Sequence, residues 1–191
     1  AQLSKHQEIP TNYSGTKTFE SVLPSAQFQY KFTLKNNLRI NYRTSNNAPS
    51  IDQLQDVLNN ANTLQLSTGN PDLKQDFQQN LNIRYSGVNT DKATSFFFLV
   101  GGNYSTNYIG NSTLIANIDT VVYNDIYLAR GSQITRPVNL DNYYSVRSFI
   151  NYTFPLSKIK TNLSVNVSGN YNNVPGLINN EINYAKTTSG S

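Results

Sequence analysis

Four arginines lie on the polar side of segments that alternate like β-strands, and they are the clearest candidates for chemistry in this sequence. They are Arg39, Arg43, Arg84 and Arg147. A guanidinium stays charged in proteins and binds carboxylate or phosphate oxygens through parallel hydrogen bonds. If the four side chains line one surface, they form a basic wall that draws in an anionic solute. The alternative is ordinary pairing with nearby acidic or amide groups.

Catalytic chemistry finds little support in the residue types. His6 is the only histidine and cysteine is absent, so a catalytic triad or a metal site would have to depend on His6. Gly101-Gly102 lies inside a predicted strand and indicates a bend or a close approach rather than a phosphate cradle. We therefore predict no enzymatic activity, no metal and no cofactor.

The elements that must position the arginines are six segments in which apolar and polar residues alternate with the period of a β-strand. In the first, Phe28 and Tyr30 face one way and Gln27 and Gln29 the other. The pattern predicts hairpins over residues 22–44, 77–108 and 144–171. Their short turns are expected at Lys35–Asn37, Gly87–Lys92 and Pro155–Lys160. Gln79 and Phe149 break the parity of their strands.

Connection lengths alternate along with the strands. Long segments at residues 45–76 and 109–143 separate the three hairpins, which is typical of an up-and-down membrane barrel with short periplasmic turns and long outer loops. A soluble sandwich more often has turns every 8–12 residues. In the first long segment, Ser50 and Gln53 predict a capping box that opens a short helix.

Aromatic residues fall near both ends of the predicted strands. Near the short turns are Phe32, Tyr85, Phe96 and Phe154. Toward the long segments are Tyr42, Phe77, Tyr104, Tyr108, Tyr144 and Tyr171. Two such groups predict the aromatic girdles that flank the apolar band of a membrane barrel. The competing interpretation is a sandwich core filled by aromatics, which the absence of tryptophan favours slightly.

Composition narrows the function classes. The 191 residues include 14% charged residues and have a mean hydropathy of -0.49. No apolar run approaches the roughly 20 residues of a membrane helix. The net charge is +4, but lysine and arginine form no run, which argues against nucleic-acid binding. With neither an initiator methionine nor a leader, we expect the chain to be trimmed from a longer one.

Several runs of residues together resemble Bacteroidetes outer-membrane β-barrel proteins, which are similar to TonB-dependent receptors. The runs are Asn37–Ser45, Ala48–Leu54, Leu66–Lys74, Thr135–Leu140 and Pro175–Asn180. Each run is moderately specific, and their order and spacing strengthen the match, which extends from about Phe19 to Tyr184.

The resemblance implies a barrel wall in the outer membrane. In full-length relatives a plug domain fills the lumen and TonB drives uptake, so the basic wall would contact the plug or an anionic solute. The implied partners are outer-membrane lipid, the rest of the barrel, the plug, TonB and an unidentified solute.

We therefore predict an all-β, antiparallel, up-and-down fold, with residues 1–191 forming one barrel segment of about six strands. Residues 179–191 are expected to be a loop-like tail. The predicted function is a section of a TonB-dependent-type receptor or transporter for nutrient uptake. The alternative is a soluble surface-binding β-sandwich, such as a carbohydrate-binding or adhesin module. A sandwich would bury the aromatic face, whereas a barrel exposes it to lipid.

Overall fold

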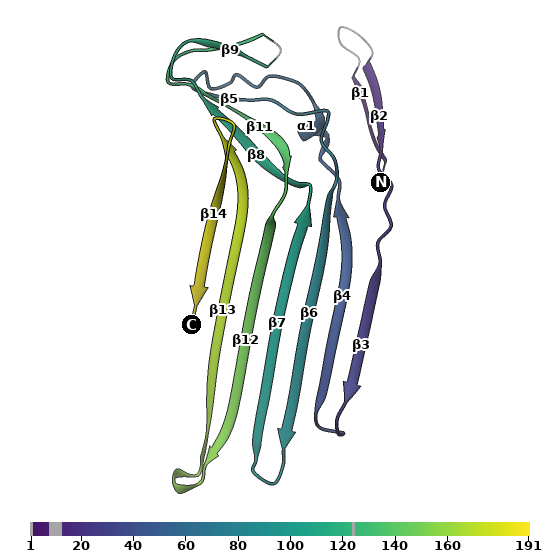
Figure 1. Cartoon of the computed structure of the whole chain (residues 1–191), viewed down its shortest axis with the longest axis vertical. Helices are drawn as coiled ribbons and strands as arrows, with labels where there is room; N and C mark the ends of the chain where they lie inside the picture. Colours follow the sequence, from purple (N-terminus) through teal and green to yellow (C-terminus); the bar gives the residue numbers. More distant parts are fainter. Residues whose placement is uncertain (1, 8–12, 124) are drawn as a thin grey trace.

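A tall antiparallel sheet dominates the computed structural model (Figure 1), which describes residues 2–7, 13–123 and 125–191, and side chains from Thr18 onward except residue 124. Its strands, in spatial order, are β3 Ser25–Lys31, β4 Asn37–Asn47, β6 Asp76–Asn89, β7 Thr94–Thr106, β12 Tyr143–Leu156, β13 Thr161–Ile178 and β14 Glu181–Gly190. A tilted membrane strand needs about 9–11 residues. From β4 onward the strands are long enough to cross.

The three predicted hairpins are confirmed. β3 pairs with β4, β6 with β7 and β12 with β13, all antiparallel. Their turns occupy residues 32–36, 90–93 and 157–160, the last containing the 3-10 turn η1 Ser157–Ile159. Figure 1 shows all three turns at the same end of the sheet, opposite the long connections.

Register places the alternating residues on consistent faces. Phe28 is paired with Ile40, Ile40 with Ile83, and Ile83 with Val100. Directly paired residues point to the same side of an antiparallel sheet, and so do residues two apart on one strand. The apolar sets, with Phe28 and Tyr30 among them, therefore share one face, as the parity predicts.

The segment 109–143, expected to be a long loop, is instead mostly strand. It contains β8 Tyr108–Ile115, β9 Thr120–Val122, β10 Ile126–Leu128 and β11 Gln133–Leu140. β8 and β11 pair antiparallel from Tyr108↔Leu140 to Ile115↔Gln133. Gly110 in β8 and Pro137 in β11 weaken the strand pattern, because both residue types are uncommon in strand interiors.

The sheet also departs from a purely antiparallel arrangement. β5 Gln65–Ser67 runs parallel to β11, and β8 runs parallel to the last residues of β13. β12 pairs with β13 only up to Asn173, so β8 takes the place beside β13 that β12 leaves free. The barrel-type sheet is therefore mixed at its long-connection end.

The expected loop-like tail at residues 179–191 is a wrong prediction, because β14 forms there. It pairs with β13 from Ile178↔Glu181 to Gly169↔Gly190. Asn179 and Asn180 make the tight turn with positive φ, a conformation that asparagine tolerates better than most residues. The alternation in β14 is short, which hid the strand: Ile182 and Tyr184 lead to Lys186 on the same face.

The predicted helix is confirmed as a single turn, α1 Ile51–Leu54, with both hydrogen bonds of the Ser50–Gln53 capping box. Beside the main sheet, β1 Gln2–Gln7 pairs with β2 Tyr13–Thr18. No helix in the described part of the chain is long and apolar enough to cross a membrane.

Candidate functional site

Register brings the four predicted arginines to one face of the sheet, here called the basic wall. Arg39 on β4 lies directly opposite Arg84 on β6. One row further, Arg147 on β12 is aligned with Gly101 on β7, which is in turn aligned with Asn82 on β6. Arg43 lies in the next row, opposite Asn80. Arg43, Arg84 and Arg147 are exposed and Arg39 is half-buried.

Gly101 makes room for Arg147. A Cβ on Gly101 would lie 2.8 Å from the Arg147 Nε and 2.9 Å from the Asn82 Oδ1. The arginine side chain therefore crosses directly over the bare β7 backbone, and its NH2 donates to the Asn82 Oδ1 at 3.2 Å. The predicted close approach at this glycine is confirmed. The group that approaches the backbone is the Arg147 guanidinium.

Arg39 and Arg84 are neighbours of like charge with few partners. The Arg39 NH2 makes a long 3.4 Å hydrogen bond to the Gln29 Oε1, while its buried Nε has no hydrogen-bond partner. The Arg84 guanidinium carbon lies 5.0 Å from the ring centre of Phe97, a cation–π contact. Neither guanidinium has an acidic partner among the described residues.

Amides and hydroxyls supply the rest of this face. Asn103 donates to Asn80 across β7 and β6 at 3.0 Å, and Asn151 donates to Asn166 across β12 and β13 at 2.6 Å. The Asn103 Oδ1 is buried without a hydrogen-bond partner, whereas the exposed Asn151–Asn166 pair leaves further donors and acceptors for water. The face is thus hydrophilic over most of its height.

An apolar patch interrupts the basic wall, and sequence parity found only part of it. Phe149, which breaks the parity of its strand, is aligned with Leu99, and its ring centre lies 5.9 Å from that of Phe97. The sequence did indicate this patch through the continuous apolar run Phe96–Val100. In a strand, the odd-numbered members of that run, Phe97 and Leu99, must face the polar side.

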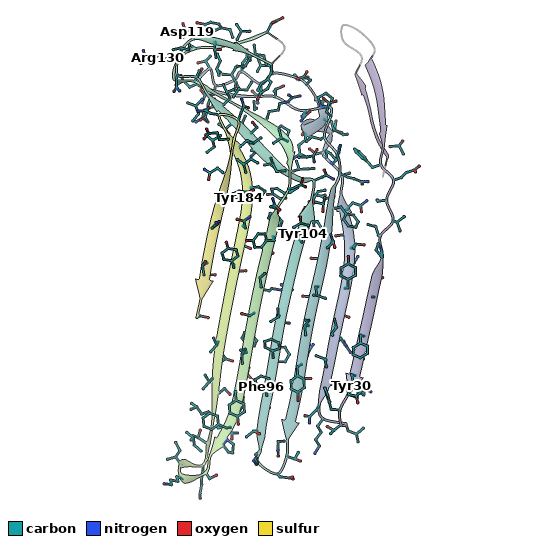
Figure 2. The ribbon with its side chains drawn as sticks, in the orientation of Figure 1. Tyr30, Phe96, Tyr104, Asp119, Arg130 and Tyr184 are labelled. Carbon is teal, nitrogen blue, oxygen red and sulfur yellow. The ribbon has the colours of Figure 1, made fainter. Side chains whose placement is uncertain are left out.

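The opposite face is apolar and exposed. Phe28, Ile150 and Val167 are 54%, 37% and 53% exposed, so in the described chain no second sheet covers this face as it would in a sandwich. In Figure 2, Tyr30 and Phe96 lie toward the short turns, whereas Tyr104 and Tyr184 lie nearer the long connections. Aromatic neighbours occur at both levels, Tyr85 with Phe96 at 5.9 Å and Tyr144 with Tyr171 at 5.8 Å. These are the two expected girdles, except at Tyr108. That residue lies in β8 and not in β7, and its ring stacks on Tyr143, which has the parity of the polar face, with ring centres 4.5 Å apart.

The long connections pack together into a structure that we call the loop cap, residues 48–75 and 107–142. It has a small core of Leu66, Ala116, Leu128 and Ile134. At Gly69 a Cβ would lie 2.0 Å from the Gln55 carbonyl oxygen, so only glycine allows these two parts of the first connection to approach this closely.

Two of the sequence runs that carried the resemblance meet inside the loop cap. Arg136 donates from Nε to the Gly69 carbonyl at 3.2 Å and from NH2 to the Asn70 Oδ1 at 3.1 Å. Asn139 accepts from the Lys74 N–H at 2.7 Å and donates to the Lys74 and Asn107 carbonyls at 3.0 and 2.9 Å. Leu66–Lys74 and Thr135–Leu140 therefore form one interlocked unit.

A carboxylate fastens the tip of the loop cap. Asp119 accepts from the Arg130 backbone N–H at 2.7 Å, and the two residues lie together at the far end in Figure 2. This bond holds the pKa of the Asp119 carboxyl below its usual range. A second bond, from the Tyr127 hydroxyl, lowers the same pKa by a smaller amount. The bond to Asp119 also raises the pKa of Tyr127.

His6, for which the sequence predicts neither a metal nor a catalytic site, lies in β1 opposite Ser14, and its side chain falls outside the described part. Among the described residues no three His, Cys, Asp or Glu side chains gather in a way that could hold a metal ion.

Comparison with known proteins agrees with this architecture. Residues 2–190 match the model of the outer membrane protein beta-barrel family. No curated protein matches the chain. A family match over nearly the whole chain, together with an exposed apolar face between two aromatic girdles, identifies its location as the outer membrane. The chain belongs to the outer membrane protein beta-barrel family.

Proposed function

We propose that this chain forms part of the wall of a TonB-dependent-type receptor or transporter that takes up a nutrient. The observation that carries the proposal is the basic wall: four arginines on a face rich in amides, directly behind a face suited to lipid. A polar interior is expected of barrels that hold water or a plug. The role proposed is binding and passage of a solute, without catalysis.

The charge of the basic wall favours an anionic partner. Arg39, Arg84 and Arg147 occupy neighbouring rows, and no acidic side chain of the described residues neutralises them. Charges of one sign that line a confined surface raise the local concentration of the opposite ion. The partner would be an anionic solute, with acidic residues of a plug domain as the second candidate.

The Arg84–Phe97–Phe149 cluster adds a second kind of contact. The Arg84 guanidinium carbon and the Phe149 ring centre lie 5.0 and 5.9 Å from the Phe97 ring centre, and the cluster offers apolar surface beside positive charge. An anionic solute with an apolar or ring-shaped part would match this combination better than a small inorganic anion.

The test replaces Arg39, Arg43, Arg84 and Arg147 with glutamine in the protein as expressed in the outer membrane. Uptake of an anionic solute should fall severalfold, while uptake of a neutral solute of similar size should change little. Lys74→Gln, in the loop cap, is the control for loss of one positive charge. Unchanged anion uptake would leave the arginines as structural pairing only.

Energy coupling needs its own measurement. Uptake by a TonB-dependent-type protein should stop in cells that lack TonB, although the solute should still bind. Passive, TonB-independent uptake would instead indicate a simple pore.

A further inference from the structure

The three hairpin turns concentrate positive charge at one end of the sheet. They contain Lys35, Lys92, Lys158 and Lys160, and their only acidic residue is Asp91. All four lysines are exposed. We call these four residues the lysine rim. The lysine rim lies at the end that faces the periplasm in barrels with short turns.

The opposite end has the reverse balance. The loop cap carries Asp52, Asp56, Asp72, Asp119, Asp125 and Asp141 against Lys74, Arg130 and Arg136. Charge is therefore distributed unevenly along the membrane normal. The short-turn end of the sheet is basic and the loop-cap end is acidic.

Large apolar side chains accompany the lysines at the same turns. Leu34 is 101% exposed, Ile159 is 67% exposed and Phe32 is 56% exposed. Leu34 precedes Lys35, and Ile159 lies between Lys158 and Lys160. Apolar tips beside ammonium groups suit the boundary between acyl chains and headgroups, where lysine amines extend toward phosphates. Inorganic phosphate would bind the ammonium groups but would make no contact with the apolar tips.

A cavity opens between the first two turns. It has a volume of about 640 Å³, and its walls include Leu34, Lys35, Tyr85 and Phe96. The Lys35 Nζ donates to the Thr90 Oγ1 at 2.9 Å, which links the two turns. Gly87 lets the Asn36 and Tyr85 side chains pack closely over the β6 backbone beside this space, because a Cβ there would lie 2.8 Å from the Asn36 Oδ1 and 3.0 Å from the Tyr85 hydroxyl.

The cavity belongs to the lipid side of the sheet. Tyr85, Gly87 and Phe96 share the apolar face, since Gly87 is aligned with Phe96 and Tyr85 lies two residues before Gly87. The space thus has aromatic and aliphatic side chains on one part of its wall and polar ones on the rest, where Lys35 and Asp91 both line it. This arrangement matches a phospholipid, whose phosphate would meet Lys35 while its glycerol and upper acyl chain lie against the rings.

We propose that the lysine rim and the adjoining cavity bind the headgroups of anionic phospholipids in the periplasmic leaflet. The contact depends on the outer-membrane location and is independent of solute uptake.

The first experiment uses the protein extracted from membranes in mild detergent, with equal amounts of phosphatidylglycerol and phosphatidylcholine. Native mass spectrometry at low ionic strength measures which lipid remains bound. We expect preference for phosphatidylglycerol, reduced about tenfold or more in Lys35→Gln/Lys92→Gln. The matched control Lys74→Gln/Lys186→Gln removes two lysines away from the turns and should keep the preference. Equal losses in both double variants, or no preference in the wild type, would overturn the proposal.

The second experiment locates the lipid. The chain has no tryptophan, so Leu34→Trp gives a single fluorescent reporter in the cavity wall. Brominated phosphatidylglycerol should quench this tryptophan more strongly than brominated phosphatidylcholine at the same mole fraction. Adding Lys35→Gln should remove the difference. Equal quenching by the two lipids would show that the turn touches the membrane without selecting a headgroup, and the proposal would be wrong.

Discussion

At the scale of single residues, the basic wall depends on what Gly101 lacks. Its neighbour Gly102 has the opposite orientation, with the Ser145 carbonyl oxygen 4.0 Å from an added Cβ. The two adjacent glycines thus have different surroundings. Gly101 leaves room for the Arg147 guanidinium, whereas Gly102 faces open space on the lipid side.

Gly101→Ala should displace Arg147 and break its bond to Asn82. Loss of this exposed hydrogen bond costs about 0.5–1.5 kcal/mol, which urea unfolding in detergent would measure. Gly102→Ala is the matched control and should change the free energy of unfolding far less. Equal effects from the two substitutions would mean that strand propensity dominates and that the seating of Arg147 contributes little.

Asp119 gives the loop cap a dependence on pH. Its folded pKa is lowered, so its contribution to stability is present above the ordinary aspartate pKa and is lost as pH falls through the folded value. We expect the protection factor of the Arg130 amide, its slowing relative to the intrinsic exchange rate at the same pH, to fall in that acidic range and to be low at neutral pH in Asp119→Ala. Asp119→Asn keeps an acceptor oxygen and should protect the amide without the pH dependence. A pH response retained by the asparagine variant would assign it to another group.

At the scale of elements, the loop cap is held by side chains that bridge segments far apart in sequence. Asn139 contacts Lys74 and Asn107 through three hydrogen bonds. One amide therefore fixes the end of β11 to both chain segments that enter the cap.

Asn139→Ala should loosen the loop cap at a cost of about 1–3 kcal/mol, because it removes three hydrogen bonds that each contribute about 0.5–1.5 kcal/mol. Limited proteolysis should then cut within residues 48–75 while the long strands remain intact. Asn172→Ala, on the polar face of β13, is the control. Cleavage that is unchanged by Asn139→Ala would show that the core around Ile134 suffices.

The elements also show which parts of the fold were predictable from sequence. The six long strands follow from alternation, since residues 25–31 repeat with period two and residues 144–154 do so with Phe149 as the one exception. β11 could not be predicted in this way, because Pro137 lies within it. β14 could not be predicted either, because its apolar set has only Ile182 and Tyr184 before Lys186.

The same limit applies to the basic wall. Parity placed the four arginines on the polar side, and a hairpin turn fixes register within β6–β7 or β12–β13. The alignment of Arg147 with Gly101 depends instead on the pairing of β7 with β12. Those strands are separated by residues 107–142, and no local pattern specifies how they meet.

At the scale of the whole molecule, the sheet has two chemically distinct faces. Val167 lies on the apolar face opposite Ile150, whereas the adjacent Asn166 lies on the polar face opposite Asn151. Neighbouring positions on one strand can therefore report on lipid and water separately.

Val167→Arg should destabilise the protein in lipid by about 2–4 kcal/mol, the cost of arginine near the middle of the membrane. Asn166→Arg should cost much less, because it loses one amide hydrogen bond but its charge stays in water. Unfolding in lipid vesicles measures both. A larger penalty for Asn166→Arg would mean that the faces are assigned the wrong way round.

The pairing of Tyr108 with Leu140 at the base of the loop cap also bears on the order of folding. The Asn107 N–H donates to the Asp141 Oδ1 at 3.2 Å. The two ends of the segment that connects β7 to β12 are therefore held side by side. Closing a chain of this length costs entropy before any distant contact forms. When β8 and β11 join first, they bring β7 and β12 to neighbouring positions, and the two strands can then pair outward from Ser105 and Tyr143. The loop cap would thus act early, as the nucleus from which the central wall is zipped together.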